Sequence, residues 1–226
     1  MILSEDGIEI IFATNYVGHH LMWKYLEPMV KKSNRGRVVL TSTSGSFLTF
    51  PHGVATSLKE LHGTVKTSQF DMKYYGQSKL AQIMWAKKLA RILTSEELEL
   101  ELELELELEL AQNDATTTIT QKRNPIHVNA GHPGAVNTAI WDKVLLPSFV
   151  DFAVNKIREK MMWNSEEGAL TILYLGAATE ELRDKHVTGK YFQPQTKEVV
   201  NPLALDEKLQ DELWRFSEEL VADFFV

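Results

Sequence analysis

The sequence contains no cysteine among its 226 residues, which excludes disulfide bonds, thiolate metal sites and a cysteine nucleophile. The seven histidines show no metal-binding spacing, because the closest pairs are His19 with His20 and His127 with His132. We therefore expect no metal site. A chain without cysteine is typical of a reducing compartment, and we expect the cytoplasm.

Long apolar runs are also missing. The longest candidate, residues 169–178, is interrupted by Thr171 and Gly176 and falls well short of the roughly 20 residues that cross a bilayer. This run predicts a buried helix, and we expect no transmembrane segment. The first six residues have neither the basic nor the apolar region of a secretion signal and resemble the interior of a domain.

Basic residues are fewer than acidic ones, 24 against 31, which gives a net charge of −7. Residues 96–110 alone hold eight glutamates and no basic residue, so the rest of the chain carries +1. A nearly neutral body without a basic stripe argues against nucleic acid as a partner.

The remaining pattern alternates helices with short strands, over a length that suits one domain from 1 to 226. Strands are predicted by β-branched runs at 37–41, 126–130 and 189–192. Helices are predicted by apolar periodicity at 6–32, 72–93, 148–162, 165–178 and 206–224. The first helix is expected to bury one stripe, which consists of Ile8, Ile11, Asn15, Gly18, Met22, Leu26 and Met29. In that stripe, Asn15 is either a satisfied structural bridge or part of a site.

Residues 96–110 alternate glutamate and leucine. A period of two nominally indicates a strand, but a row of like charges opposes strand pairing and both residue types are good helix formers. The pattern therefore leaves the secondary structure open. With the polar residues 111–124, this stretch predicts a low-complexity insertion at about 94–124. We interpret it as an expanded repeat; a leucine-faced segment that binds a partner is the alternative.

Tyr75 and Lys79 lie four residues apart at the start of the 72–93 helix and so share a face. An ammonium held beside a phenol makes the phenol a better acid, and lowering its pKa from near 10 to near 8 takes roughly 2.7 kcal/mol. Among six tyrosines, only Tyr75 has a lysine at the fourth position. Tyr75 is therefore a candidate general acid/base. The alternative is a surface lysine beside a half-buried tyrosine.

Two loops follow strand ends and are expected to lie near this pair. Residues 41–44 supply four hydroxyls after the first strand, and residues 131–138 form a loop with glycine and proline after the second. Open α/β sheets bind ligands at the carboxyl ends of their strands. The second loop is thus either part of a ligand site or a plain turn.

This order of motifs resembles the catalytic half of the short-chain dehydrogenase/reductase superfamily, and within it the retinol-dehydrogenase and WW-domain-oxidoreductase type. The matching stretches are 6–9 with 15–19, 75–80, 132–138 and 189–192. The resemblance implies a Rossmann-like, doubly wound parallel α/β sheet, here with about three strands and flanking helices. It also implies an NAD(P)-dependent oxidoreductase that interconverts an alcohol and a carbonyl on a lipophilic small molecule.

The resemblance also implies roles for particular residues. Tyr75 would be the catalytic acid/base, and Lys79 would hold the nicotinamide ribose and tune Tyr75. Asn15 would hold a water in the proton relay. The substrate-orienting hydroxyl falls on Thr43, or on Ser44 if the strand end shifts by one residue. The residues expected at the nicotinamide are Pro133, Gly134 and Val136, with Thr138 at its carboxamide or the neighbouring phosphate.

The sequence departs from the family pattern at its N-terminal end. No glycine-rich strand, turn and helix is present, nor the residue that chooses between NADP and NAD. We expect the first mononucleotide-binding half to be absent, one edge of strand 37–41 to be bare, and dinucleotide binding to be weakened. The alternative function is an inactive remnant, either unstable or acting as an interaction module. Because the family commonly dimerises through the equivalents of helices 6–32 and 72–93, a dimer with itself or a relative is conceivable.

Overall fold

The computed structural model describes residues 2–63, 72–110, 125–136, 162–178 and 180–225. A four-stranded sheet with the order β1-β2-β3-β4 lies at its centre. The strands are β1 (Arg37–Thr41), β2 (His127–Gly131), β3 (Lys190–Gln193) and β4 (Lys197–Glu198). The first three pair in parallel and β4 pairs antiparallel with β3. The three predicted strands and the α/β class are confirmed, and the sheet is Rossmann-like.

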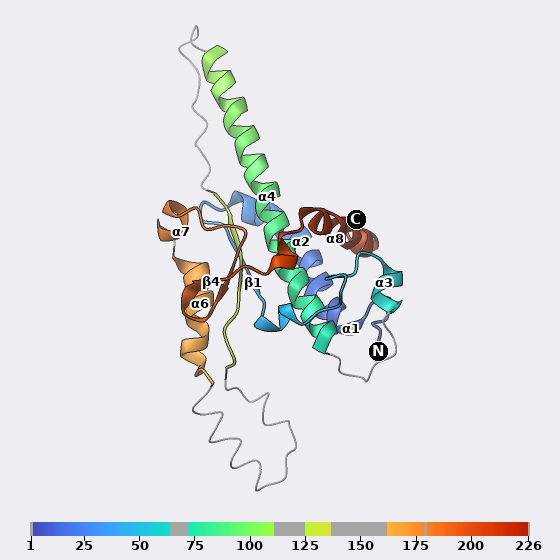
Figure 1. Ribbon diagram of the computed structural model, residues 1–226. Coiled ribbons are helices and arrows are strands. Elements are labelled where there is room, and N and C mark those ends of the chain that lie inside the picture. The colour runs from blue at the N-terminus through green and yellow to red at the C-terminus, as the bar shows by residue number, and fades with distance from the viewer. Residues whose placement is uncertain (1, 64–71, 111–124, 137–161, 179, 226) are drawn as a thin grey trace.

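Helices flank the sheet on both sides (Figure 1). On one side lie α6 (Ser165–Ala177) and α7 (Glu180–Asp184), and on the other α2 (Gly18–Lys32), α4 (Met72–Leu110) and α8 (Glu207–Val221). The shorter elements are α1 (Ile10–Phe12), the π-helical turn η1 (Ala13–Val17), α3 (Leu58–Gly63) and the 3-10 turns η2 (Ser44–Phe47), η5 (Pro194–Thr196), η6 (Pro202–Leu205) and η7 (Ala222–Phe224). Apart from residue 162, the helix expected over 148–162 lies outside the described residues.

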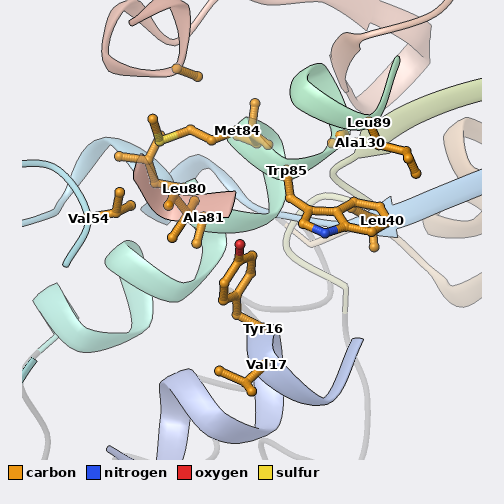
Figure 2. Packing of buried hydrophobic residues seen from close by; sticks show 14 of the residues in the cluster. Tyr16, Val17, Leu40, Val54, Leu80, Ala81, Met84, Trp85, Leu89 and Ala130 are labelled. Carbon is orange, nitrogen blue, oxygen red and sulfur yellow. The ribbon is translucent and has the colours of Figure 1, made fainter. Parts of the chain in front are cut away.

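The larger core packs α4 against the sheet, α2 and α8. Leu80, Met84 and Leu89 of α4 are each at most 1% exposed, and Val128 and Ala130 of β2 are fully buried. Figure 2 shows Tyr16 and Val17 below α4 and Trp85 beside Leu40 of β1. Thus α4 is a central helix with neighbours on several sides. This packing fixes the position of the side chains on its first turn.

The buried face of α1, η1 and α2 differs from the predicted stripe. Phe12, Tyr16, His20 and Trp23 are buried, whereas the stripe continues through three exposed residues, Met22, Leu26 and Met29. The four-residue spacing of Phe12, Tyr16 and His20 suits the wider π-helical turn of η1, which a regular 3.6-residue period does not anticipate. Ile11 and Asn15 are half-buried, and the predicted stripe is wrong from Gly18 onward.

Strand β1 lies at the edge of the sheet. Within the described residues it pairs only with β2, in register from Arg37 with His127 to Thr41 with Gly131. All five residues of β2 are buried, whereas Arg37, Val38 and Val39 of β1 are only half-buried. For the described part of the chain, this agrees with the expected bare edge.

The Glu-Leu segment is helical, because α4 continues without a break from Met72 to Leu110. Its distal half projects beyond the rest of the molecule (Figure 1). Length alone does not make it a membrane helix: across the residues that the structure describes, no helix is apolar enough over a sufficient length to span a bilayer.

Candidate functional site

The carboxyl ends of β1 and β2 bring two predicted loops together. Thr41 pairs with Gly131 at the last register position of the parallel strands, so both loops leave the sheet at the same edge. Ser44 Oγ then lies 3.5 Å from His132 Nε2, which puts the hydroxyl-bearing loop in contact with the glycine-proline loop. The arrangement matches the position where open α/β sheets bind ligands.

The first turn of α4 is pressed against the loop after β1. A Cβ atom on Gly76 would lie far inside contact distance of the Leu48 carbonyl oxygen and 2.6 Å from that of Gly45. Both atoms belong to the backbone, so only glycine permits this approach. A further link forms where the buried Ser42 Oγ donates to the Lys79 carbonyl at 2.8 Å. The sequence Tyr75-Gly76 therefore places the phenol at the strand end.

Tyr75 and Lys79 lie side by side, as their spacing predicts. The Lys79 ammonium is 5.8 Å from the centroid of the Tyr75 ring. It donates to the Thr41 carbonyl at 2.9 Å and to Gln82 Oε1 at 3.1 Å. Both side chains are half-buried, so each is held by packing yet remains open to a small molecule.

Burial controls the protonation of this pair. It raises the pKa of Tyr75 above its ordinary value and lowers the pKa of Lys79. The expectation of a lowered Tyr75 pKa is therefore wrong in its net direction for this structure, because burial outweighs the effect of the nearby ammonium. The ammonium directs its hydrogen bonds to Thr41 and Gln82, and desolvation of the phenol dominates. At neutral pH the phenol keeps its proton and is a proton donor.

The structure separates the two hydroxyl candidates. Thr43 Oγ1 accepts from the Gly45 amide at 3.3 Å and caps η2. A Cβ atom on Gly45 would meet Thr43 Cγ2 at 3.2 Å and Tyr75 Cε1 at 3.6 Å, so Thr43 and Tyr75 flank the same glycine. Ser44 is exposed and faces His132. The Thr43 methyl group and the Tyr75 ring thus both border Gly45, whereas Ser44 contacts the other loop.

Asn15 connects to both members of the pair. Its Nδ2 donates to Ser78 Oγ at 3.1 Å, and Ser78 Oγ donates to the Tyr75 carbonyl at 2.8 Å. Its own carbonyl accepts from Gln82 Nε2 at 2.6 Å. Asn15 therefore bridges η1 and α4 through its side-chain amide and its backbone carbonyl, and its role in a site stays a prediction.

Sequence reasoning missed Gln82. The signal was present, because Gln82 is a polar residue three positions after Lys79 in an otherwise apolar stretch, Leu80-Ala81-Gln82-Ile83-Met84. A polar side chain buried at that spacing must find hydrogen-bond partners on the face that it shares with Lys79.

The glycine-proline loop folds around His132. Its Nδ1 accepts from the Gly134 amide at 3.1 Å, and burial lowers the pKa of this imidazole. The neutral ring therefore carries its proton on Nε2, which faces Ser44. Gly134 has a φ of 90°, and a Cβ there would lie 2.5 Å from Trp163 Cδ1. His132 entered the sequence prediction only as part of a motif, and no site role was given to it.

The other loop candidates are placed less centrally. Pro133 is half-buried. Val136 packs closely on Gly168 of α6: a Cβ atom added to Gly168 would lie 2.5 Å from Val136 Cγ2. Val136 also forms an isolated bridge with Trp163. Thr138 lies outside the described residues. Within the described ranges, no group of three His, Asp or Glu side chains is arranged to hold a metal ion.

Comparison with known proteins identifies relatives along nearly the whole chain. It is 32% identical to the short-chain dehydrogenase TIC 32 A, chloroplastic, of Brassica napus, over 97% of this chain and 59% of the relative. It is 29% identical to polyprenol dehydrogenase of Danio rerio and 28% to retinol dehydrogenase 14 of Homo sapiens, each over 96% of this chain and 57% and 54% of the relative. No protein-family model matches.

A solved structure shares the fold of this chain. An uncharacterised protein from Mycobacterium Paratuberculosis superposes with a TM-score of 0.57 at 22% identity, covering 98% of this chain and 62% of that one. The chain is thus similar along nearly its whole length to proteins named as dehydrogenases, and it spans between 54% and 59% of the three relatives named above.

Proposed function

We propose that this chain carries the proton-transfer half of an NAD(P)-dependent oxidoreductase that interconverts an alcohol and a carbonyl. The observation that carries the proposal is the half-buried Tyr75 phenol held beside the Lys79 ammonium at the carboxyl ends of β1 and β2. The named dehydrogenase activities of the relatives support the same reaction class.

Tyr75 exchanges the proton with the oxygen of the substrate. Because its phenol is protonated at neutral pH, it donates to the oxygen when a carbonyl is reduced and must lose its proton before it can accept one from an alcohol. The Lys79 charge beside it stabilises the phenolate that forms after donation. Thr43, whose methyl group borders Gly45 together with the Tyr75 ring, is the residue whose hydroxyl we propose to orient the substrate oxygen.

The residues at this edge fit the nicotinamide end of a dinucleotide. The nicotinamide, when bound, supplies or takes up the hydride. The Lys79 ammonium has three N–H groups, of which Thr41 and Gln82 use two, so one remains for a ribose hydroxyl. Pro133, Gly134, Val136 and Thr138 are the proposed ring-side residues. This sequence contains no glycine-rich turn for the pyrophosphate. The residue that selects between NADP and NAD belongs to the same missing region, so the residues proposed here do not determine the choice of coenzyme.

A lipophilic substrate suits the surface next to Tyr75. Phe47 and Leu48 directly follow the hydroxyl-bearing residues and are 43% and 59% exposed. The carbonyl of Leu48 touches the turn at Gly76, so the backbone that carries these two side chains passes beside the first turn of α4. Retinol and polyprenol, named in the relatives, are alcohols on long apolar chains and belong to the class that we propose.

Turnover of a long-chain aldehyde with NADPH or NADH, compared between the wild type and Tyr75→Phe, tests the proposal. Loss of the phenolic proton should lower kcat about 10²- to 10⁴-fold. The fold should survive, since within the described residues no hydrogen bond engages the Tyr75 hydroxyl. Tyr25→Phe, which removes a hydroxyl from an exposed tyrosine on α2, is the control and should keep full activity. A wild type without turnover, or a Tyr75→Phe variant as active as the control, would overturn the proposal.

A further inference from the structure

The Gln82 side chain bridges Lys79 and Asn15. Its Oε1 accepts from the Lys79 ammonium at 3.1 Å and its Nε2 donates to the Asn15 carbonyl at 2.6 Å. The orientation of the amide is determined, because an ammonium can only donate and a carbonyl can only accept. Gln82 is 2% exposed, so its position is set by packing as well as by these two bonds.

We propose that Gln82 is a positioning residue: it holds the Lys79 ammonium in place beside Tyr75 and stabilises its charged form. The inference deepens the proposed oxidoreductase function and rests on it. Gln82 itself acts only through Lys79.

The surroundings of Lys79 make this acceptor important. Within the described residues no carboxylate forms an ion pair with Lys79, so the two acceptors that stabilise its charge are neutral, the Thr41 carbonyl and Gln82. Burial opposes the charge on Lys79. The pKa of the neighbouring His19 is lowered by its own burial first and by the Lys79 charge second. Hydrogen bonds to a charged donor are roughly twice as strong as neutral ones, so losing one of two acceptors should be felt at the ammonium.

The bridge also fixes geometry between two elements. Lys79 and Gln82 are three positions apart on α4, and Asn15 lies in η1, the π-helical turn against which α4 packs. Without Gln82, the ammonium keeps the Thr41 carbonyl but loses its link to η1. A lysine with four rotatable carbon-carbon bonds then has more freedom to leave the Tyr75 ring.

The test is the pKa of Lys79, measured by NMR on the full chain with isotope-labelled lysine and assigned with Lys79→Arg. Gln82→Leu removes a neutral acceptor and should lower the Lys79 pKa by about one unit, whereas Gln82→Glu offers a carboxylate and should raise it by a similar amount. Two variants at one position with shifts of opposite sign are not expected from a merely structural role.

Gln77→Leu is the matched control. Gln77 is also a buried glutamine on α4, but its Oε1 accepts from the Ala55 amide, and among the described residues no hydrogen bond joins it to Lys79. This variant should lose stability without moving the Lys79 pKa. The proposal is overturned if neither Gln82 variant changes that pKa, or if Gln77→Leu changes it equally. If Gln82→Leu does not fold, the sign seen with Gln82→Glu decides.

The same readout separates this inference from the proposed function. The Lys79 pKa needs neither substrate nor coenzyme, so a chain with the predicted shifts but no turnover would refute the oxidoreductase and leave the Lys79 bridge standing. An active wild type whose Lys79 pKa ignores Gln82 would refute only the bridge. In the active protein, the pH profile of kcat should move in the same directions as the Lys79 pKa.

Discussion

The two halves of α4 have the same backbone and opposite surroundings. From Tyr74 to Leu93 most side chains are buried, including Leu80, Ile83 and Met84 at 1% exposure or less. Beyond them, Leu98, Leu100, Leu102 and Leu106 are between 47% and 65% exposed. One half is a helix because the molecule packs around it; the other is a helix because glutamate and leucine favour that conformation.

The period of the sequence explains the difference. A two-residue repeat on a 3.6-residue helix sends successive leucines to opposite sides, so Leu98 and Leu102 share one face while Leu100 points elsewhere. The apolar surface is split into two stripes with glutamates between them and cannot form a single core face. Helix propensity therefore extends the element, whereas only the proximal half positions Tyr75 and Lys79.

The largest effect is expected at the start of the proximal half. Gly76→Ala places a methyl group against the backbone carbonyls of Gly45 and Leu48, neither of which can move without displacing the loop after β1. We expect a loss of about 3 kcal/mol or more in the free energy of unfolding, at the upper end of overpacking, and loss of any activity. Urea denaturation measures the first.

Gly176→Ala is the control for that substitution. Gly176 lies in α6 and a Cβ there meets nothing within 4 Å, so alanine should stabilise the helix by about 0.5–1 kcal/mol. If the two alanines had equal effects, the close approach at Gly76 would not be what holds the first turn of α4 in place.

A matched pair of leucines tests the comparison along the helix. Leu89→Ala empties a site that is 1% exposed and should cost about 2–5 kcal/mol. Leu102→Ala, at 65% exposure, should change stability by less than about 0.5 kcal/mol. A large loss at Leu102, seen as a fall in Tm, would mean that the distal leucines pack against something, as the partner-binding interpretation requires.

The sequence predicted the elements of the described fold better than their faces. The strands at 37–41, 126–130 and 189–192 and the meeting of Tyr75 with Lys79 followed from local composition and spacing. The buried face of α2 did not, because the π-helical turn at Ala13–Val17 changes the helical phase and leaves no simple composition signal.

The pKa of Tyr75 and the hydrogen-bond partners of Lys79 could not be predicted from the local sequence. The spacing of Tyr75 and Lys79 shows that they meet, but it does not show where the ammonium points. Thr41 and Gln82 take its hydrogen bonds, and the depth of burial that raises the Tyr75 pKa depends on the loop held by Gly76. Likewise, only the tertiary structure places Thr43 on the side of Tyr75 and Ser44 on the side of His132.

Acid should affect the two halves of α4 in opposite directions. In the proximal half, Trp85 Nε1 donates to His20 Nδ1 at 2.8 Å, inside a cluster with Trp214. His20 Nε2 lies 3.3 Å from Glu218, close enough for an ion pair though not aligned as a hydrogen bond, and Glu218 also pairs with Lys24. Burial is the largest influence and lowers the His20 pKa below its ordinary 6.5.

The sign of the proximal effect follows from that lowered pKa. Below about pH 6.5, His20 binds a proton in the unfolded chain but stays neutral in the folded chain. The free energy of unfolding is therefore highest above this pH and falls as the pH drops toward the His20 pKa of the folded chain. Burial also lowers the pKa of His19, His127 and His132, which adds to the same direction. We expect a loss on the order of 1–3 kcal/mol between pH 7 and 5, measured by urea denaturation followed by tryptophan fluorescence.

His20→Gln should be less stable at pH 7 but should flatten this dependence, and an unchanged slope would remove His20 as its source.

The distal half should respond the other way, because Glu97 and Glu101, like Glu99 and Glu103, stand four apart and like charges at that spacing destabilise a helix. Protonating them relieves the repulsion, so a peptide of residues 94–110 should gain helical circular dichroism as the pH falls. The opposite responses would show that packing holds one half of α4 and intrinsic propensity the other.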